Sequence, residues 1–199
     1  DLGTLGINND AGVPLSSIKI ALTDSDVNAD NDVAELQDIV NALDKLIAAD
    51  DNAANTVTVS DLETIGVNIK EGVTIGAINE VLTDPDTTWV DTIGVQKVVD
   101  SLKKLVDLGG GGAPGDSKIT QDDLNTFGIK ESDLSSGELR YLNDEISNSG
   151  TDYLSNIALL QTLVTNIYDN ALRADRIADL DADSDTNIDD DNITSDTTP

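Results

Sequence analysis

The sequence contains no cysteine, no methionine and no histidine. Without cysteine and histidine there are no disulfide bonds, no thiolate or imidazole metal ligands, and no catalytic mechanism that uses either side chain. Aromatic residues make up only 3% of the chain, so a hydrophobic core must be built from Leu, Ile, Val and Ala. Because no apolar run approaches the roughly 18 residues of a membrane-spanning helix, we expect no membrane insertion.

Positive charge is scarce as well. Eleven basic residues stand against 39 acidic ones, which gives a formal net charge of −28. Nucleic acids and anionic lipids are polyanions, so this charge predicts neither as a partner. An acidic composition that is poor in lysine and free of cysteine is common in secreted bacterial surface proteins and in salt-adapted ones, and it suits surroundings rich in calcium. We therefore expect an extracellular protein at the cell surface.

The chain begins with Asp1 and has no methionine at all. A translated protein starts with methionine, so we expect this sequence to be a processed product or a piece of a longer chain.

Internal repeats determine the predicted fold. The segment beginning Asp1-Leu2-Gly3-Thr4-Leu5-Gly6-Ile7 recurs 60 residues later at Asp61 and a further 62 residues later at Asp123. A second segment, Gln37-Asp38-Ile39-Val40-Asn41-Ala42-Leu43, recurs at Gln96 and at Gln161. Three tandem copies follow from this pattern, and we place them at residues 1–60, 61–122 and 123–199, the last with an acidic C-terminal tail.

Each copy reads as three helical pieces, which we call A, B and C. The A pieces are short and end at a glycine that acts as a helix stop, at Gly6, Gly66 and Gly128. The B pieces carry Leu15, Ile18 and Leu22, then Ile75, Ile78 and Leu82, then Leu134, Leu139 and Leu142. The C pieces show the apolar spacing of a long amphipathic helix and end near Asp50, Leu108 and Ala178. The predicted fold class is all-α: a tandem array of three small three-helix units of about 60 residues, in which neighbouring copies brace one another.

Two acidic segments carry oxygen-bearing side chains at every second position. A curling loop of the EF-hand type points alternate side chains inward at a hard cation, so this spacing predicts bound calcium. The candidate ligands are Asp24, Asp26, Asn28, Asp30 and Asp32 in the first segment, and Asp181, Asp183, Asp185, Asn187, Asp189 and Asp191 in the last.

Both segments depart from a complete EF-hand loop. With Asp181 at position 1, Thr186 replaces the turn glycine and Asn192 replaces the bidentate acid. A purely structural interpretation is that Asp and Asn favour turns and helix caps and keep the surface soluble. Against it, seven acidic residues lie between Asp179 and Asp191, and their mutual repulsion favours bound cations.

No catalytic constellation stands out. In the absence of histidine a hydrolase would need a Ser–Lys pair or two paired carboxylates, and the eight lysines fall on predicted helix faces or loop edges. A pair of carboxylates acting on sugars would lack an aromatic-lined cleft. The sequence therefore predicts a protein that is not an enzyme.

The repeated motifs resemble those of a known class. The segments Thr58–Val67, Ile78–Leu82 and Glu35–Ala42 resemble the tandem helical repeats of giant bacterial surface adhesins of the RTX, type I secreted class. The order of a glycine corner and two helices is also similar to the albumin-binding GA modules of Gram-positive surface proteins. The resemblance implies a stalk or adhesive module. The RTX nonapeptide is absent, so the β-roll calcium sites of that class do not carry over.

Together these features predict a non-enzymatic structural or adhesion protein, part of a bacterial surface stalk or filament that calcium stiffens at its joints. Its partners would be neighbouring repeats or head-to-tail copies of itself. One alternative is a module that grips a host or matrix protein with one helix face, which requires an exposed apolar patch at the same place in each copy. Another is a halophilic protein, which would need molar salt to fold and would ignore chelators.

Overall fold

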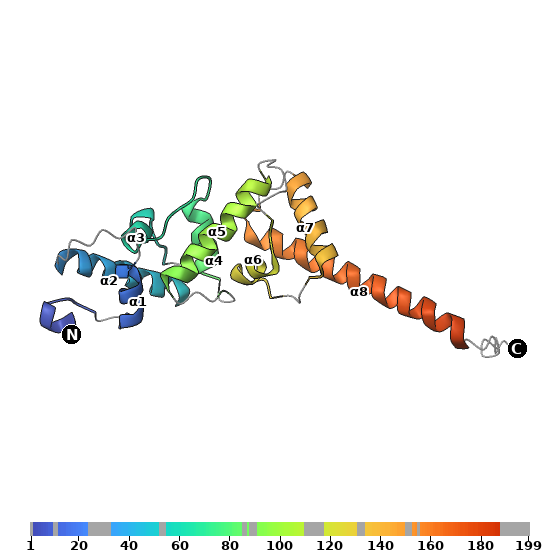
Figure 1. The fold of residues 1–199 in the computed structure, drawn as a ribbon, viewed down its shortest axis with the longest axis horizontal. Coiled ribbons are helices and arrows are strands. Elements are labelled where there is room, and N and C mark those ends of the chain that lie inside the picture. The colour runs from blue at the N-terminus through green and yellow to red at the C-terminus, as the bar shows by residue number, and fades with distance from the viewer. Residues whose placement is uncertain are drawn as a thin grey trace, which may run out of the picture.

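The computed structural model of the chain describes residues 2–9, 12–23, 33–51, 55–84, 87, 91–109, 118–130, 134–149, 153–154 and 156–187. Within these residues every regular element is a helix, so the prediction of an all-α fold is confirmed there (Figure 1). A 3₁₀-helix, η1 (Leu2–Leu5), precedes eight α-helices: α1 (Leu15–Thr23), α2 (Val33–Asp51), α3 (Val59–Thr64), α4 (Ile75–Leu82), α5 (Thr92–Gly109), α6 (Gln121–Thr126), α7 (Ser136–Ser149) and α8 (Ile157–Asn187). The A pieces correspond to η1, α3 and α6, the B pieces to α1, α4 and α7, and the C pieces to α2, α5 and α8.

The three glycine corners share one backbone geometry. After α3, the N–H of Val67 donates to the carbonyl of Leu62 at 2.9 Å, and the N–H of Gly66 donates to that of Glu63 at 3.0 Å, which is the Schellman pattern. The backbone at this corner has a positive φ that strains any residue with a Cβ, so glycine is needed there. Positive φ angles occur at Gly6 (75°), Gly66 (84°) and Gly128 (77°). The same two bonds join Ile7 to Leu2 and Gly6 to Gly3, and Ile129 to Leu124 and Gly128 to Asn125. The predicted helix stops are thus confirmed.

The long C helices bury the apolar stripes that their sequences predict. In α5 the buried positions follow the spacing i, i+3, i+4, i+7 that places side chains on one helix face. These side chains are Val95, Val98, Val99, Leu102, Leu105 and Leu108, all of which are at most 3% exposed. Each such burial contributes about 1.5–3 kcal/mol relative to an exposed side chain, so these stripes hold the fold together.

The helices interlock across the boundaries of the sequence copies. α2 packs on α1 of its own copy and also on α3 and α4 of the next, and α5 packs on α4 and also on α6 and α7. α8 packs on α7 and also on α4 of the preceding copy. One continuous hydrophobic cluster therefore extends from Ile7 to Ile167 and includes residues of all three copies.

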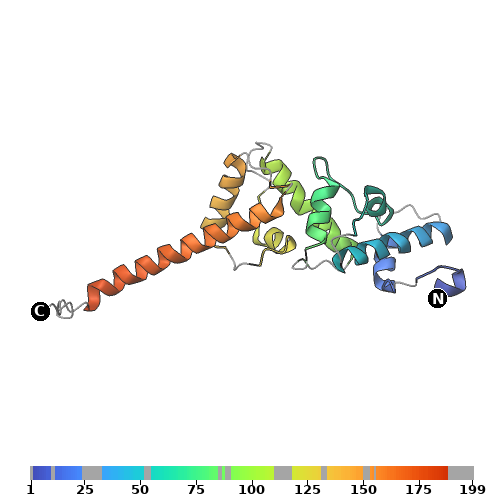
Figure 2. The same cartoon turned by 180° about the vertical axis from the view of Figure 1, so that it is seen from behind.

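The last helix runs further than its sequence predicted. α8 continues to Asn187 rather than closing near Ala178, because no glycine or proline interrupts residues 157–187. Its second half extends away from the other helices, at the opposite end of the molecule from η1 (Figures 1 and 2). The predicted calcium-binding segment that begins at Asp181 is consequently helical backbone through Asn187.

Candidate functional site at the joints between sequence copies

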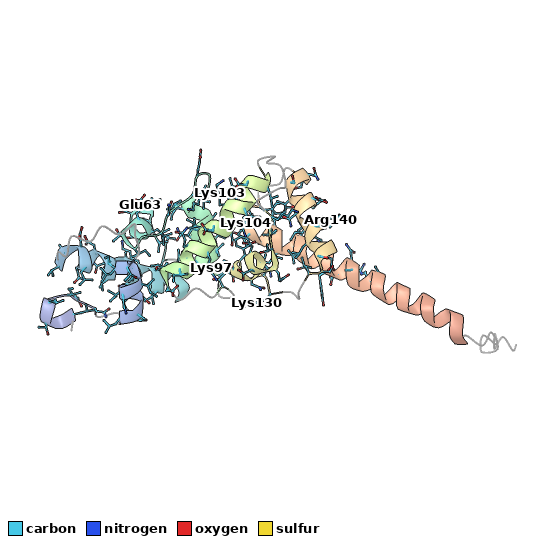
Figure 3. The ribbon with its side chains drawn as sticks, in the orientation of Figure 1. Glu63, Lys97, Lys103, Lys104, Lys130 and Arg140 are labelled. Atoms are coloured by element: carbon cyan, nitrogen blue, oxygen red, sulfur yellow. The ribbon has the colours of Figure 1, made fainter. Side chains whose placement is uncertain are left out.

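An ion pair crosses each boundary between copies at equivalent positions. At the first boundary, Lys45 Nζ on α2 lies 2.5 Å from Asp61 Oδ1 on α3. At the second, Lys104 Nζ on α5, labelled in Figure 3, lies 2.6 Å from Asp123 Oδ1 on α6. Both lysines stand eight residues after the glutamines that align the C pieces. The same contact therefore joins successive copies twice.

Each of these aspartates also caps the helix on which it lies. Asp61 Oδ2 accepts from the N–H of Thr58 at 2.9 Å and from its hydroxyl at 2.6 Å, and the N–H of Asp61 donates to Thr58 Oγ1 at 3.2 Å. Thr120 and Asp123 repeat this reciprocal arrangement on α6, with corresponding distances of 2.8, 2.6 and 3.3 Å. Such a capping box satisfies helix N–H groups that have no partner within the helix. One carboxylate thus starts the A helix and binds it to the preceding C helix.

Two opposing effects set the pKa of each aspartate. Burial raises the pKa because it disfavours the charged form, whereas hydrogen bonds from the lysine and the threonine lower it. The hydrogen bonds outweigh burial, so the pKa of Asp61 and that of Asp123 both lie below the usual value for aspartate. Both carboxylates are therefore ionised at neutral pH and pair with their lysines.

An asparagine in the B helix holds the segment that leads into each joint. Asn143 on α7 accepts from the N–H of Ile119 at 2.7 Å and donates to the carbonyls of Ile119 and Leu139 at 2.9 and 2.7 Å. Asn79 on α4 makes the same three bonds, to Val57 and Ile75. The amide thereby satisfies both backbone groups of a buried residue just before the capping threonine. Sequence reasoning missed these residues, although each is a polar position inside an apolar helix pattern.

A glutamine at the start of each of the first two C helices holds the segment after the glycine corner. Gln37 Oε1 accepts from the N–H of Asn8 at 2.7 Å, and its amide donates to the Asn8 carbonyl at 3.0 Å. Gln96 makes the same pair of bonds with Asn68, at 2.7 and 3.2 Å. The aligned glutamines of the sequence repeat are thus structural contacts between pieces A and C of one copy.

A further polar contact links two copies that are distant in sequence. Glu80 Oε1 on α4 accepts from the N–H of Ile157, the first residue of α8, at 2.8 Å. Because a helix N-terminus carries unpaired N–H groups and partial positive charge, a carboxylate there is stabilising. The second copy thereby fixes where the last helix begins.

The predicted calcium ligands lie largely beyond what the structure describes. Asp24, Asp26, Asn28, Asp30 and Asp32 fall outside the described residues, as do Asp189 and Asp191. Asp181, Asp183, Asp185 and Asn187 fall within the helical backbone of α8. The curling loop that motivated this prediction is therefore not the backbone described there. In the described part of the chain, no cluster of three or more acidic side chains is arranged to hold a metal.

One cleft lies beside the second joint. Its volume is about 510 Å³, and it runs between the segment at Lys118–Thr120 and α7, where Arg140 lines it (Figure 3). Two polar side chains of its wall are engaged within the protein, because Asn143 is bonded to Ile119 and Leu139, and Thr120 to Asp123. On this side the cleft is therefore lined by residues of the second joint.

Comparison with protein-family models, with curated proteins and with solved structures gave no match to this chain. The resemblance to surface adhesins therefore stays an expectation from the sequence. Among the helices of the described segments, none is both long enough and apolar enough to cross a membrane.

Proposed function

We propose that the chain is a non-enzymatic structural repeat protein, a tandem array of three helical units that forms part of an extracellular stalk or filament of a bacterial surface. The observation that supports this most strongly is the repeated joint of lysine, aspartate and threonine at both copy boundaries. A joint that recurs with the same residues and distances sets each copy at a defined orientation to the next. A stalk needs a defined orientation between successive copies, whereas a catalytic or ligand-binding site needs to occur only once in a chain.

The sharing of long helices supports the same function. Because α2 and α5 each pack on two successive copies, one copy bends relative to its neighbour only by separating a buried interface. The resulting body is extended, with η1 at one end and the projecting half of α8 at the other (Figure 2). Such an array spans distance with few residues and resists bending.

Calcium binding by the acidic segments is part of the proposal. Asp179, Asp181, Asp183 and Asp185 lie near the C-terminal end of α8, and its last turn carries no basic residue. Negative charge is unfavourable at that end of a helix, where the carbonyl groups carry partial negative charge. Bound cations would relieve this repulsion and the larger repulsion expressed in the net charge of −28.

Small-angle X-ray scattering of the whole chain tests the structural proposal. We expect the distance distribution of one extended rigid body, and a broader one for the double variant Lys45→Met and Lys104→Met at unchanged helix content. The variant Lys97→Met and Lys103→Met, in which both lysines lie on α5 but outside the joints, serves as the control. Scattering by independent, freely oriented bodies in the wild-type chain would overturn the proposal of a rigid spacer.

Thermal melting followed by circular dichroism tests the calcium proposal separately. At fixed ionic strength we expect calcium to raise the midpoint by several degrees and EGTA to reverse this, because a ligand bound only by the folded state stabilises it. Equal melts in calcium and EGTA would remove calcium from the proposal. If molar monovalent salt alone restored stability, the halophilic alternative would take its place.

The binding-module alternative finds less support. It requires an apolar patch repeated on every copy, but Leu5 of the first copy is 54% exposed while its equivalents Ile65 and Phe127 are buried. Exposed apolar side chains of the other copies, such as Ile93, Tyr141 and Leu159, do not stand at the position equivalent to Leu5, so among the described side chains no apolar patch recurs at this position. This arrangement fits a terminal interface better than a repeated ligand-binding face.

A further inference from the structure

The first sequence copy exposes apolar side chains at positions that the other copies bury. Leu5 on η1 is 54% exposed, whereas Ile65 and Phe127 at the equivalent position are 0% and 1% exposed. Leu22 on α1 is 38% exposed, whereas Leu82 and Ile146 are 0% and 1% exposed. A third leucine of the same end, Leu15, is 67% exposed. We call the exposed leucines Leu5, Leu15 and Leu22 together the N-terminal face.

The packing of the other copies shows what covers this face. α3 and α4 are covered by α2 from the preceding copy, and α6 and α7 are covered by α5. The first copy already makes the remaining contacts of the pattern, since α1 packs on α2 and α5 just as α4 packs on α5 and α8. Among the elements that the structure describes, the contact of this pattern that η1 and α1 do not make is the one with a preceding C helix.

The covering surface of a C helix has a defined chemistry. In α5 it consists of Ser101, Lys104, Leu105 and Leu108, because Ser101 and Lys104 both bond to Asp123 on the following A helix. In α2 the same positions are Ala42, Lys45, Leu46 and Ala49. A C helix that covers a following copy therefore presents a small residue, a lysine, a leucine and an apolar residue, at steps of three, one and three.

The last C helix does not carry this chemistry. The equivalent positions of α8 are occupied by Asn166, Asp169, Asn170 and Arg173, all of them exposed. Polar side chains on the outer surface of a terminal repeat keep such arrays soluble. The α8 helix of a second copy thus lacks the apolar residues and the lysine needed to cover the N-terminal face, and this argues against a head-to-tail polymer built through α8.

We propose that the N-terminal face is a docking site for an amphipathic helix with the α2 and α5 pattern, supplied by a further repeat of the same kind. This inference rests on the structural function proposed above and adds to it the end of the array at which a further repeat binds. In this proposal a further repeat packs its C helix at the η1 end, whereas the covering positions of α8 lack the residues that such packing needs. The chemistry expected of the partner is that of the covering surfaces of α2 and α5.

A covalent extension tests the proposal on the whole protein. A second copy of residues 33–60 is fused ahead of Asp1, so that its C helix and its capping threonine precede η1 as α2 and Thr58 precede Asp61. We expect amide hydrogen exchange to slow at least tenfold in residues 2–7 and 15–22, and the melting midpoint to rise. The matched control extension carries the α8 pattern, with Ala42→Asn, Lys45→Asp, Leu46→Asn and Ala49→Arg in the added segment only. Equal exchange in the two extended chains would overturn the proposal.

Sedimentation of the chain without an extension tests whether a second copy occupies the face instead. We expect a monomer whose mass does not depend on concentration. A dimer that the variant Leu5→Asp and Leu22→Asp dissociates, and that Leu159→Asp on α8 leaves intact, would assign the face to a second copy and overturn the proposal. Neither sedimentation result bears on the joints between copies within the chain, because the scattering of the lysine variants tests those joints.

Discussion

Ser101 Oγ on α5 donates a hydrogen bond of 2.7 Å to Asp123 Oδ1 on α6, and the first joint has no such bond because Ala42 stands at the position of Ser101. The side chain of Asp123 is also the more buried of the two, at 5% exposed against 11% for Asp61. The two joints therefore have the same arrangement of lysine, aspartate and threonine but differ in the number of hydrogen bonds that each carboxylate accepts.

Replacing the joint aspartates is expected to destabilise the two joints unequally. Asp123→Asn should lower the free energy of unfolding by about 2 kcal/mol and Asp61→Asn by about 1 kcal/mol, because a buried carboxylate with charged and neutral donors loses more than a less buried one. Urea denaturation measures both. Asp122→Asn, next to the joint but exposed, is the control and should change stability by less than about 0.5 kcal/mol. Equal losses at Asp61 and Asp122 would show that the pair on α2 and α3 contributes nothing.

The same aspartates predict a pH dependence whose sign follows from their pKa values. Both pKa values are lower in the folded chain than the ordinary value of 3.8. Their contribution to stability is thus fully present above that value and is lost as the pH falls through the folded pKa values. Protonation of other acidic residues relieves general repulsion over the same range, so we compare the wild-type chain with the double variant Asp61→Asn and Asp123→Asn. The difference between their free energies of unfolding should stay constant between pH 5 and 7 and shrink below pH 4. A difference between the free energies of unfolding that remains undiminished at pH 2 would contradict this assignment.

Two equivalent glycines separate backbone strain from steric contact. Gly12 and Gly72 have φ angles of +74° and +83°, but only at Gly72 would a Cβ meet a neighbour, Val106 Cγ1, at 2.7 Å. Gly12→Ala should cost about 1 kcal/mol from the left-handed backbone alone. Gly72→Ala should cost about 2–3 kcal/mol, because a methyl group is also forced against α5. Thermal melts measure the loss of stability caused by each substitution. Adding Val106→Ala should reduce the loss caused by Gly72→Ala but not the loss caused by Gly12→Ala. Equal costs at both glycines would mean that Val106 moves aside freely.

The buried asparagine clamp predicts the largest polar effect. Asn143→Ala should destabilise the chain by about 3 kcal/mol, because the N–H and carbonyl of Ile119 lose their partners inside the protein. Hydrogen exchange at Ile119 should accelerate together with the loss measured by denaturation. Asn148→Ala on the same helix removes one exposed bond to the carbonyl of Asp144 and should cost less than about 0.5 kcal/mol. If Ile119 exchanged at the wild-type rate in Asn143→Ala, water would be taking over the role of the amide.

The sequence predicted the elements well because their signals are local. A glycine such as Gly66 after a short capped segment ends a helix whatever lies around it, and the apolar stripe of α5 identifies a helix by its spacing. It did not predict how the copies interlock. Periodicity shows that Leu105 is buried but not whether its own copy or the next one covers it.

The polar contacts were harder to anticipate than the core. Lys45 and Lys104 looked like ordinary lysines on a helix face, since nothing in the spacing shows that an aspartate 16 or 19 residues later lies opposite. The end of α8 was missed for a different reason. Its acidic residues suggested a loop, but without glycine or proline the helix continues, and side-chain composition alone did not reveal this.

The shared C helices also bear on how the length of such a chain can vary. α2 and α5 have the same register, so deletion of residues 46–104, which is 59 residues, joins residues 33–45 of α2 to residues 105–109 of α5 and leaves Lys45 at the position of Lys104. We expect the hybrid helix to pack on α1 behind it and on α6 and α7 ahead of it, with Lys45 opposite Asp123. Recombination between copies at this point can therefore shorten the array by one repeat and keep the lysine–aspartate joint, whereas the contact of α4 with α8 and the bond from Ile157 to Glu80 are lost.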